Sequence, residues 1–296
     1  MASLPPAHRW PGVLPLAGRQ LVGLIGVLGG AVVWLALLGP LGALLAHLSP
    51  TALRSSLSAP QALAPLVTSV EASAIALVVL VGAGTPLAWA MARDRLPAPR
   101  LWEGGVLVAL LMPPLVVGLL LVFLVGPLTP IGHGLAHLHL SASNTFFALV
   151  LAEIYEAAPY YVLGASAAFS SVDPELEQHA CLLGDTWWRS LRRITLPLAA
   201  PGLVSALAMA WARAMGAFGA VIVIAYHPYG LPMQIWVTLE QSGLPAALPF
   251  ALVLLVVALP LPLAAYLWTA RARMSSGPGP LTGPSPDSSI AEPGPR

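Results

Sequence analysis

Three ionisable side chains, Glu153, Glu156 and Arg213, stand within otherwise apolar stretches of this 296-residue chain. A lone cation near the centre of a bilayer costs about 2.5–3.5 kcal/mol on insertion scales, so Arg213 needs either a partner or a purpose. Glu153 and Glu156 are the candidate partners, because their i, i+3 spacing places both carboxylates on one helix face. One hypothesis is a structural ion pair between helices. The other is that Arg213 lines a pathway and offers a transient positive field to an oxyanion.

The remaining reactive side chains do not form a recognisable chemical centre. His133, His137 and His139 have ligand-like spacing, but no carboxylate or cysteine lies beside them, so we do not expect a metal site there. The single cysteine, Cys181, rules out an intrachain disulfide. The chain has no lysine, which excludes a Gly-x-x-x-x-Gly-Lys-Ser/Thr phosphate loop, and no hydrolase motif is present. The chain is therefore predicted not to be an enzyme.

Composition indicates a membrane protein. Hydrophobic residues make up 57% of the chain and charged residues only 8%, which exceeds what one soluble core buries. Runs that can cross about 30 Å of hydrocarbon and show no period-two alternation predict helices, because backbone groups in lipid must bond within the segment. The fold class is therefore all-α, a polytopic membrane protein with about six transmembrane helices. The six runs are Leu21–Leu45, Leu66–Met91, Gly104–Val125, Asn144–Phe169, Leu198–Ala225 and Ala246–Ala270.

The arginines predict the orientation of these spans. Eleven of the thirteen lie before the first span, after the second, the fourth or the sixth, or in the tail beyond it, whereas the alternate loops carry only Arg54. Since cytoplasmic loops are enriched in cations, both termini are expected to be cytoplasmic, in a prokaryotic inner membrane. The expected parts are a cytoplasmic N-terminal segment (1–20), a transmembrane domain (21–273) and a disordered cytoplasmic tail rich in Pro, Gly and Ser (274–296). The first run is too long for a signal-peptide core, so it is predicted to be a retained span.

The polar segment 173–202, between the fourth and fifth spans, predicts a helix, a turn and a second helix. Asp173 can cap the first helix with Pro174 at its first position, and Gly184 ends that helix. A second short helix can begin near Asp185, with tryptophans on one side and arginines on the other, before Pro197 starts the next span. An amphipathic loop in the lipid headgroup zone is the plainer alternative.

This loop resembles the coupling loop of permease subunits of ATP-binding cassette (ABC) importers. Their motif reads Glu-Ala-Ala, three residues, Gly, nine residues, Ile, one residue, Leu-Pro. Gln178 and His179 replace the motif's Glu and first Ala, while an acidic residue remains just before them. The resemblance implies a coupling helix that docks into a groove of a cytoplasmic ATPase subunit. The residues implied are Glu177, Ala180, Gly184, Ile194, Leu196 and Pro197.

The segment Trp211–Trp236 resembles the permeases of molybdate, tungstate and sulfate importers. Their motif is Ala-Arg-Ala, two residues, Glu-Phe-Gly-Ala, and this chain matches it except that Ala217 replaces the Glu. The resemblance implies import of an oxyanion, molybdate or tungstate ahead of sulfate. Thiamine or iron permeases are the alternative within ABC importers, but those commonly fuse two halves into one longer chain.

The resemblance also implies the partners. They are a second permease copy, two ATPase subunits that carry ATP and Mg, and an extracytoplasmic binding protein, with no cofactor in this chain. We expect the residues around the membrane cation to line the translocation pathway, with Phe218 as a possible apolar gate, although packing explains the glycines equally well. These are Arg213, Gly216, Phe218, Gly219, Glu153 and Glu156. The alternative class is a secondary transporter or channel driven by ion gradients, for which the two carboxylates are the evidence.

Overall fold

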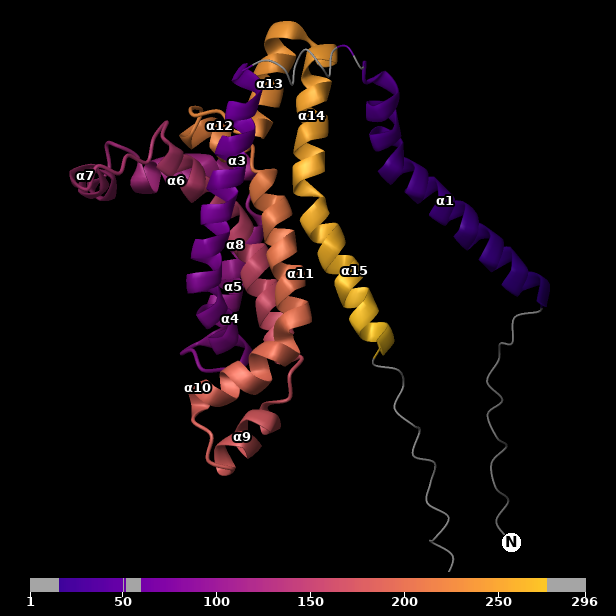
Figure 1. Cartoon of the computed structure of the whole chain (residues 1–296), viewed down its shortest axis with the longest axis vertical. Coiled ribbons are helices and arrows are strands. Elements are labelled where there is room, and N and C mark those ends of the chain that lie inside the picture. Colours follow the sequence, from indigo (N-terminus) through magenta and orange to yellow (C-terminus); the bar gives the residue numbers. More distant parts are fainter. Residues whose placement is uncertain (1–15, 50, 52–59, 276–296) are drawn as a thin grey trace, which may run out of the picture. The chain divides into compact units, whose positions relative to one another are not determined.

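The computed structural model describes residues 16–49, 51 and 60–275, and these residues contain helices and no strand (Figure 1). The prediction of an all-α fold is confirmed. The chain separates into two compact units, Met1–Leu53 and Arg54–Arg296. Most of the predicted N-terminal segment and almost all of the predicted C-terminal tail lie outside the described residues.

Within the first unit, helix α1 (Leu16–His47) is apolar on all sides. It begins five residues before the run predicted at Leu21, and its part from Leu24 to His47 is long and apolar enough to cross a membrane. Large hydrophobic side chains such as Val27, Trp34 and Leu35 are exposed. A helix with no polar face is typical of a span that is surrounded by lipid.

Five helices in the described residues are long and apolar enough to span a membrane, and a bent pair of helices can supply a sixth span. The six predicted runs therefore all correspond to helical segments. The five are Leu24–His47, Leu63–Ala92, Phe146–Ser170, Trp187–Met215 and Leu244–Arg271, and the pair is α5 (Pro99–Leu111) with α6 (Pro114–Val125).

The predicted run Gly104–Val125 is broken at Pro113 and Pro114, as these prolines predict, and α5 and α6 meet at 115°. Met112 and Pro113 between them have extended backbone, with ψ of 133° and 132°. Pro113 and Pro114 have no N–H to continue the helix, and a proline also disfavours helical backbone in the residue before it. The break leaves α6 and the following α7 (Pro130–His137) directed away from the line of α5 (Figure 1).

Two spans contain a π turn directly ahead of a proline. The second span consists of α3 (Pro60–Val79), η1 (Leu80–Gly84) and α4 (Thr85–Ala92), with Pro86 in second position after the π turn. The fifth consists of α10 (Trp187–Ser190), η2 (Leu191–Thr195) and α11 (Leu196–Met215), with Pro197 in the same place. A π turn re-routes the carbonyls that a proline cannot bond, so the helix continues.

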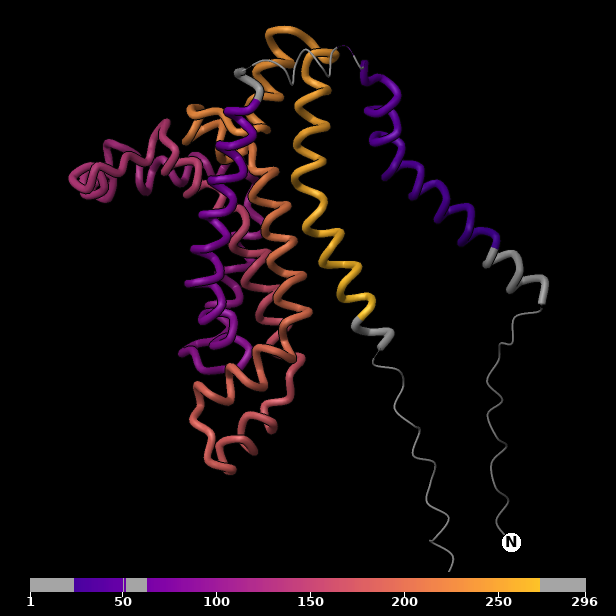
Figure 2. The backbone as a smooth tube through the Cα atoms, in the orientation of Figure 1, coloured from indigo at the N-terminus to yellow at the C-terminus, as the bar shows by residue number. Residues whose placement is uncertain are grey.

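The fifth span therefore has different ends from those predicted. Pro197 does not start it, because the helix is already continuous from Trp187, and Figure 2 shows the coil of the backbone running on from α10 into α11. It ends at Met215, ten residues before the predicted end at Ala225, because Gly216 leaves the helix. The short helix α12 (Val221–Ile224) follows after a turn.

Helix α8 (Phe146–Ser170) is the centre of the bundle and packs against α3, α4, α5 and α11. Small residues allow its close approach to α11. A Cβ at Gly164 would lie 2.7 Å from the Cβ of Ala206, and one at Gly202 would lie 2.5 Å from the Cβ of Ala168. Because lipid is as apolar as the helices, such close packing is a main source of association between spans.

The remaining helices complete the second unit at its two ends. Helix α9 (Pro174–Leu182) lies with α10 at the end of the bundle that carries the polar loop (Figure 1). Helix α13 (Leu231–Ser242) packs against α14 (Leu244–Ala258), and α15 (Pro260–Ser275) packs against α11.

Replacing Gly202 by Ala tests the close packing of α8 and α11. The added methyl group has no room beside Ala168, so we expect a loss of about 1–3 kcal/mol, as for overpacking in a core. The melting temperature of the protein in detergent measures this. Gly105→Ala in α5 is the control, because nothing lies within 4 Å of its added Cβ. Equal melting temperatures for the two variants would contradict the packing described.

Candidate functional site

The polar loop between α8 and α11 folds as the predicted helix, turn and helix. The side chain of Asp173 accepts a hydrogen bond of 2.9 Å from the Glu175 N–H and so caps α9, with Pro174 in its first turn. Gly184 has φ of +97°, which favours glycine, and it separates α9 from α10. The sequence thus fixes the shape of this hairpin locally, through one capping residue and one glycine.

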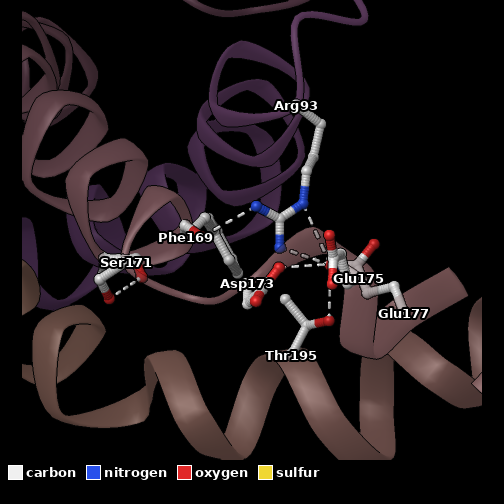
Figure 3. Close-up of polar contacts among 8 residues, drawn as sticks. Arg93, Phe169, Ser171, Asp173, Glu175, Glu177 and Thr195 are labelled. Carbon is white, nitrogen blue, oxygen red and sulfur yellow. Dashed lines mark hydrogen bonds and ion pairs between the residues drawn. The ribbon is translucent and has the colours of Figure 1, made fainter. Parts of the chain in front are cut away.

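A buried ion pair holds the hairpin against the bundle. Arg93, at the end of α4, donates to Oε1 of Glu177 in α9 through Nη2 at 2.6 Å and through Nε at 3.1 Å. The same arginine donates through Nη1 to the carbonyl oxygen of Phe169 at 3.1 Å, and Thr195 donates to Oε1 of Glu177 at 2.8 Å (Figure 3). Both charged side chains are largely buried, with 7% and 11% exposure. One carboxylate oxygen therefore joins α4, α9 and η2, and the arginine adds the end of α8.

Aromatic contacts reinforce the same junction. The rings of Trp89 in α4 and Trp187 in α10 meet edge to face with centroids 5.0 Å apart, and the guanidinium of Arg95 lies 5.2 Å from the Trp89 ring centroid. Edge-to-face rings and a cation over an indole are both favourable geometries. The second span and the hairpin are thus packed as one piece.

The tip of the hairpin exposes apolar side chains. Leu182 and Leu183 are 84% and 89% exposed, and Trp188 is 56% exposed. An apolar group at a protruding loop is a common feature of protein interaction sites. Among the predicted loop residues, Ala180 and Glu177 are buried in the hairpin and Gly184 is exposed at the turn. Ile194 and Leu196 are partly buried at the base of α11, and Pro197 beside them is exposed.

Sequence reasoning missed both Arg93 and the leucine tip. Arg93 entered the prediction only as one of the cations expected on the cytoplasmic side. Its position directly after a span, on the same side as an acidic residue in an amphipathic helix, is the signal that could have suggested the pair. Leu182 and Leu183 lie at positions that the coupling-loop motif leaves unspecified, so the motif does not predict them.

The ion pair predicted for Arg213 is formed with Glu156 and not with Glu153. Nη2 of Arg213 lies 2.6 Å from Oε2 of Glu156, whose Oε1 accepts a hydrogen bond of 3.1 Å from the Ala220 N–H. Glu153 instead accepts a hydrogen bond of 2.9 Å from the hydroxyl of Ser73 in α3. The i, i+3 spacing predicts both carboxylates on one helix face, but Glu156 pairs with α11 and Glu153 bonds to α3.

Arg213 lies in the last turn of α11, not near the middle of a span as predicted, because the helix ends at Met215. Its side chain is 29% exposed, and its guanidinium lies 5.8 Å from the ring centroid of Tyr160. Beyond it, the Phe218 ring packs against Trp236 with centroids 5.7 Å apart, and Gly219 lies against Pro114. The structure thus brings Arg213, Glu156 and the turn 216–220 together.

Up to six apolar helical segments that can cross a membrane, with a polar helical hairpin between the fourth and fifth, define a polytopic membrane protein. Residues 84–273 match the family described as binding-protein-dependent transport system inner membrane component, and the chain belongs to this family of ABC importer permeases. The family assignment favours this class over a secondary transporter or channel.

Curated relatives support this assignment. The probable molybdenum ABC transporter permease of Haloferax volcanii is 38% identical over 259 residues, which cover 87% of this chain and 94% of that protein. The molybdenum transport system permease protein ModB of Mycobacterium tuberculosis is 33% identical, covering 68% of this chain and 78% of its own. The sulfate transport system permease protein CysT of Escherichia coli is 30% identical, covering 77% and 84%.

A solved structure has the same fold. A chain of the bacterial alginate ABC transporter, in complex with a pentasaccharide-bound periplasmic protein, superimposes with a TM-score of 0.66. The match covers 86% of this chain and 96% of that chain, at 18% identity. At this identity the likeness supports the architecture alone.

Replacing Glu177 by Ala tests the buried pair that holds the hairpin. Arg93 would remain buried without its carboxylate, and we expect a loss of about 3–5 kcal/mol. Thermal melting in detergent, with hydrogen exchange of residues 173–195, measures this.

The control for this variant is Asp185→Ala. The Asp185 carboxylate lies 3.4 Å from Arg189 and 3.9 Å from Arg193, and both arginines are exposed. Its loss should cost less than about 1 kcal/mol, because exposed pairs contribute little. Similar losses of stability for Glu177→Ala and Asp185→Ala would show that the buried pair contributes no more to stability than an exposed pair.

Proposed function

We propose that this chain is half of the membrane pore of an ATP-driven importer of an oxyanion, with molybdate or tungstate ahead of sulfate. The observation that carries the proposal is the continuous helix Trp187–Met215, which joins the polar hairpin at one end to the Arg213 cluster at the other. Relatives named for molybdenum and sulfate transport support the choice of substrate.

The hairpin is the proposed docking site for a cytoplasmic ATPase subunit. Its exposed Leu182 and Leu183 can enter an apolar groove, while the Arg93–Glu177 pair keeps the hairpin rigid against α4 and α8. A rigid contact is needed, because a soft loop would absorb the movement of the ATPase instead of passing it to the spans. ATP and Mg would then be held by that partner subunit, and this chain would supply no catalytic group and no cofactor site.

The oxyanion must be driven inward. Moving a dianion against a negative-inside potential costs about 2.3 kcal/mol per charge per 100 mV, so an energy source is required. Arg213 is already paired with Glu156 yet partly exposed, so it can offer a weakened positive field without the tight fork that would hold an oxyanion. This supports a role for Arg213 and the turn with Gly216, Phe218 and Gly219 at the pathway wall.

The proposed assembly places two copies of this chain around a twofold axis, with two ATPase subunits and a binding protein that delivers the anion from outside. Arg93 and Arg95 lie at the hairpin end of the second unit, through their contacts with Glu177 and Trp89. Cations gathered at that end support a cytoplasmic hairpin, and the distribution of arginines along the sequence supports cytoplasmic termini.

Uptake measurements test the proposed function. The chain is reconstituted into vesicles with its genomic-neighbour ATPase and binding protein, and uptake of labelled molybdate, tungstate and sulfate is followed in competition. We expect ATP-dependent uptake that is strongest for molybdate or tungstate. Uptake of none of the three would reject the oxyanion, and uptake without ATP would reject the ABC mechanism.

Gly184→Asp tests the role of the hairpin in the same vesicles. A side chain at φ of +97° is strained, and a second carboxylate beside Asp185 adds repulsion, so we expect uptake to fall at least about tenfold. Gly184→Asn is the matched control, since Asn has the same size, tolerates positive φ better and adds no charge. Copurification of the ATPase should fall in parallel with uptake. Normal uptake by the Asp variant would contradict docking at this turn.

A further inference from the structure

The far end of the fifth helix meets a single buried carboxylate. The helix runs for 29 residues from Trp187 to Met215, which is about 43 Å at 1.5 Å per residue. Its first turn belongs to the hairpin and its last turn carries Arg213. A displacement of the hairpin would therefore be transmitted through this helix to Arg213. Among the described residues, Glu156 is the only ion-pair partner of Arg213.

Glu156 spans the turn that follows. Its Oε2 lies 2.6 Å from Nη2 of Arg213, before the turn, and its Oε1 accepts the Ala220 N–H at 3.1 Å, after the turn. Glu156 is 5% exposed. One carboxylate from α8 therefore fixes both ends of residues 216–220.

On its other side, the turn 216–220 packs against α6, the second half of the broken third span. A Cβ at Gly118 in α6 would lie 2.8 Å from the carbonyl oxygen of Ala220, and Gly219 lies directly against Pro114. The backbones of the turn and of α6 lie close together on this side, so the turn packs directly on α6. The position of Phe218 is thus set by Glu156 on one side and by α6 on the other.

We propose that Glu156 is the positioning residue of the pathway turn 216–220, which receives the displacement of α11 and sets the place of Phe218. This inference rests on the proposed function for its transport consequence. It also accounts for Ala217, the position where the motif of the similar permeases has a glutamate. Ala217 is 3% exposed and lies four residues beyond Arg213, just past the end of α11, so the carboxylate that this turn lacks is supplied from α8.

Glu153, one turn earlier in α8, is also buried, but burial alone does not make a carboxylate a positioning residue of the turn. Its hydrogen-bond partner is the Ser73 hydroxyl of α3, and among the described residues it makes no hydrogen bond or ion pair with the turn. The geometry therefore singles out Glu156 between two carboxylates of similar burial.

The test moves the carboxylate from α8 to the turn. Glu156→Ala, Glu156→Gln and the double variant Glu156→Ala with Ala217→Glu are reconstituted with the ATPase and binding protein, and anion uptake per ATP hydrolysed is measured for each. The double variant conserves the charge and the total side-chain volume of the pair. Tyr161→Phe is the control, because it removes another buried polar contact of α8, the one with Thr85 at 2.6 Å, without changing the turn.

We expect Glu156→Ala to lower uptake per ATP at least about tenfold, since Arg213 loses its only carboxylate. The double variant should recover to within about threefold of the wild type, and Tyr161→Phe should match the wild type. Glu156→Gln should fall between, because its amide oxygen can still accept the Ala220 N–H but carries no charge for Arg213.

Three results would overturn the proposal. They are wild-type uptake per ATP in Glu156→Ala, equal losses in Glu156→Ala and Tyr161→Phe, and no recovery in a double variant that melts like the wild type. If Glu156→Ala does not fold, Glu156→Gln decides, and wild-type coupling in it rejects the role. If the wild type itself transports no anion, the proposed function fails. Melting temperatures in detergent then test Glu156 separately, since the double variant must melt above Glu156→Ala.

Discussion

A polar backbone group in hydrocarbon must find a partner within the protein, and this constraint shapes most of the second unit. Long helices satisfy it by themselves. The interruptions after Met215 and before Leu231 do not, and buried side chains complete them. Glu156 accepts the N–H of Ala220 at the start of α12, and Ser69 accepts the N–H of Leu231 at the start of α13. Irregular backbone at these places therefore depends on side chains of α3 and α8.

The hairpin outside the spans is built on a different principle. There the backbone can reach water, so its shape comes from a capping aspartate and a glycine with positive φ, and its attachment comes from one ion pair. Glu177 accepts three hydrogen bonds at one oxygen, from Arg93 twice and from Thr195. Because most of the stability of a buried pair comes from such complete bonding, the junction can be both polar and rigid. The exposed leucines at the tip are then free to face a partner.

Much of this architecture could be predicted from the sequence, and the misses share a cause. Length and hydropathy located all six spans, and capping rules located the hairpin, because both signals are local. Pro113 and Pro114 indicate the break between α5 and α6, but the end of α11 at Met215 was missed, since an apolar run looks the same whether or not its helix has ended. The site depends on contacts between distant segments, such as Arg93 with Glu177 and Glu156 with Ala220, which are 84 and 64 residues apart. The hydrophobic periodicity of a sequence does not predict which distant residues pair. The pathway residues remain predictions.

The π turns ahead of Pro86 and Pro197 have a consequence for how the faces of these helices are assigned. A π turn accommodates one extra residue, which sets the angular position of every later side chain back by about 100° relative to an unbroken α-helix. A helical wheel drawn through residues 187–215 with one period therefore mixes two faces. The tryptophan side of α10 and the Arg213 side of α11 belong to separate wheels. Deleting one residue from Leu191–Thr195 would remove the extra residue and merge the wheels, so a regular α-helix would keep Arg213 on the side of Glu156.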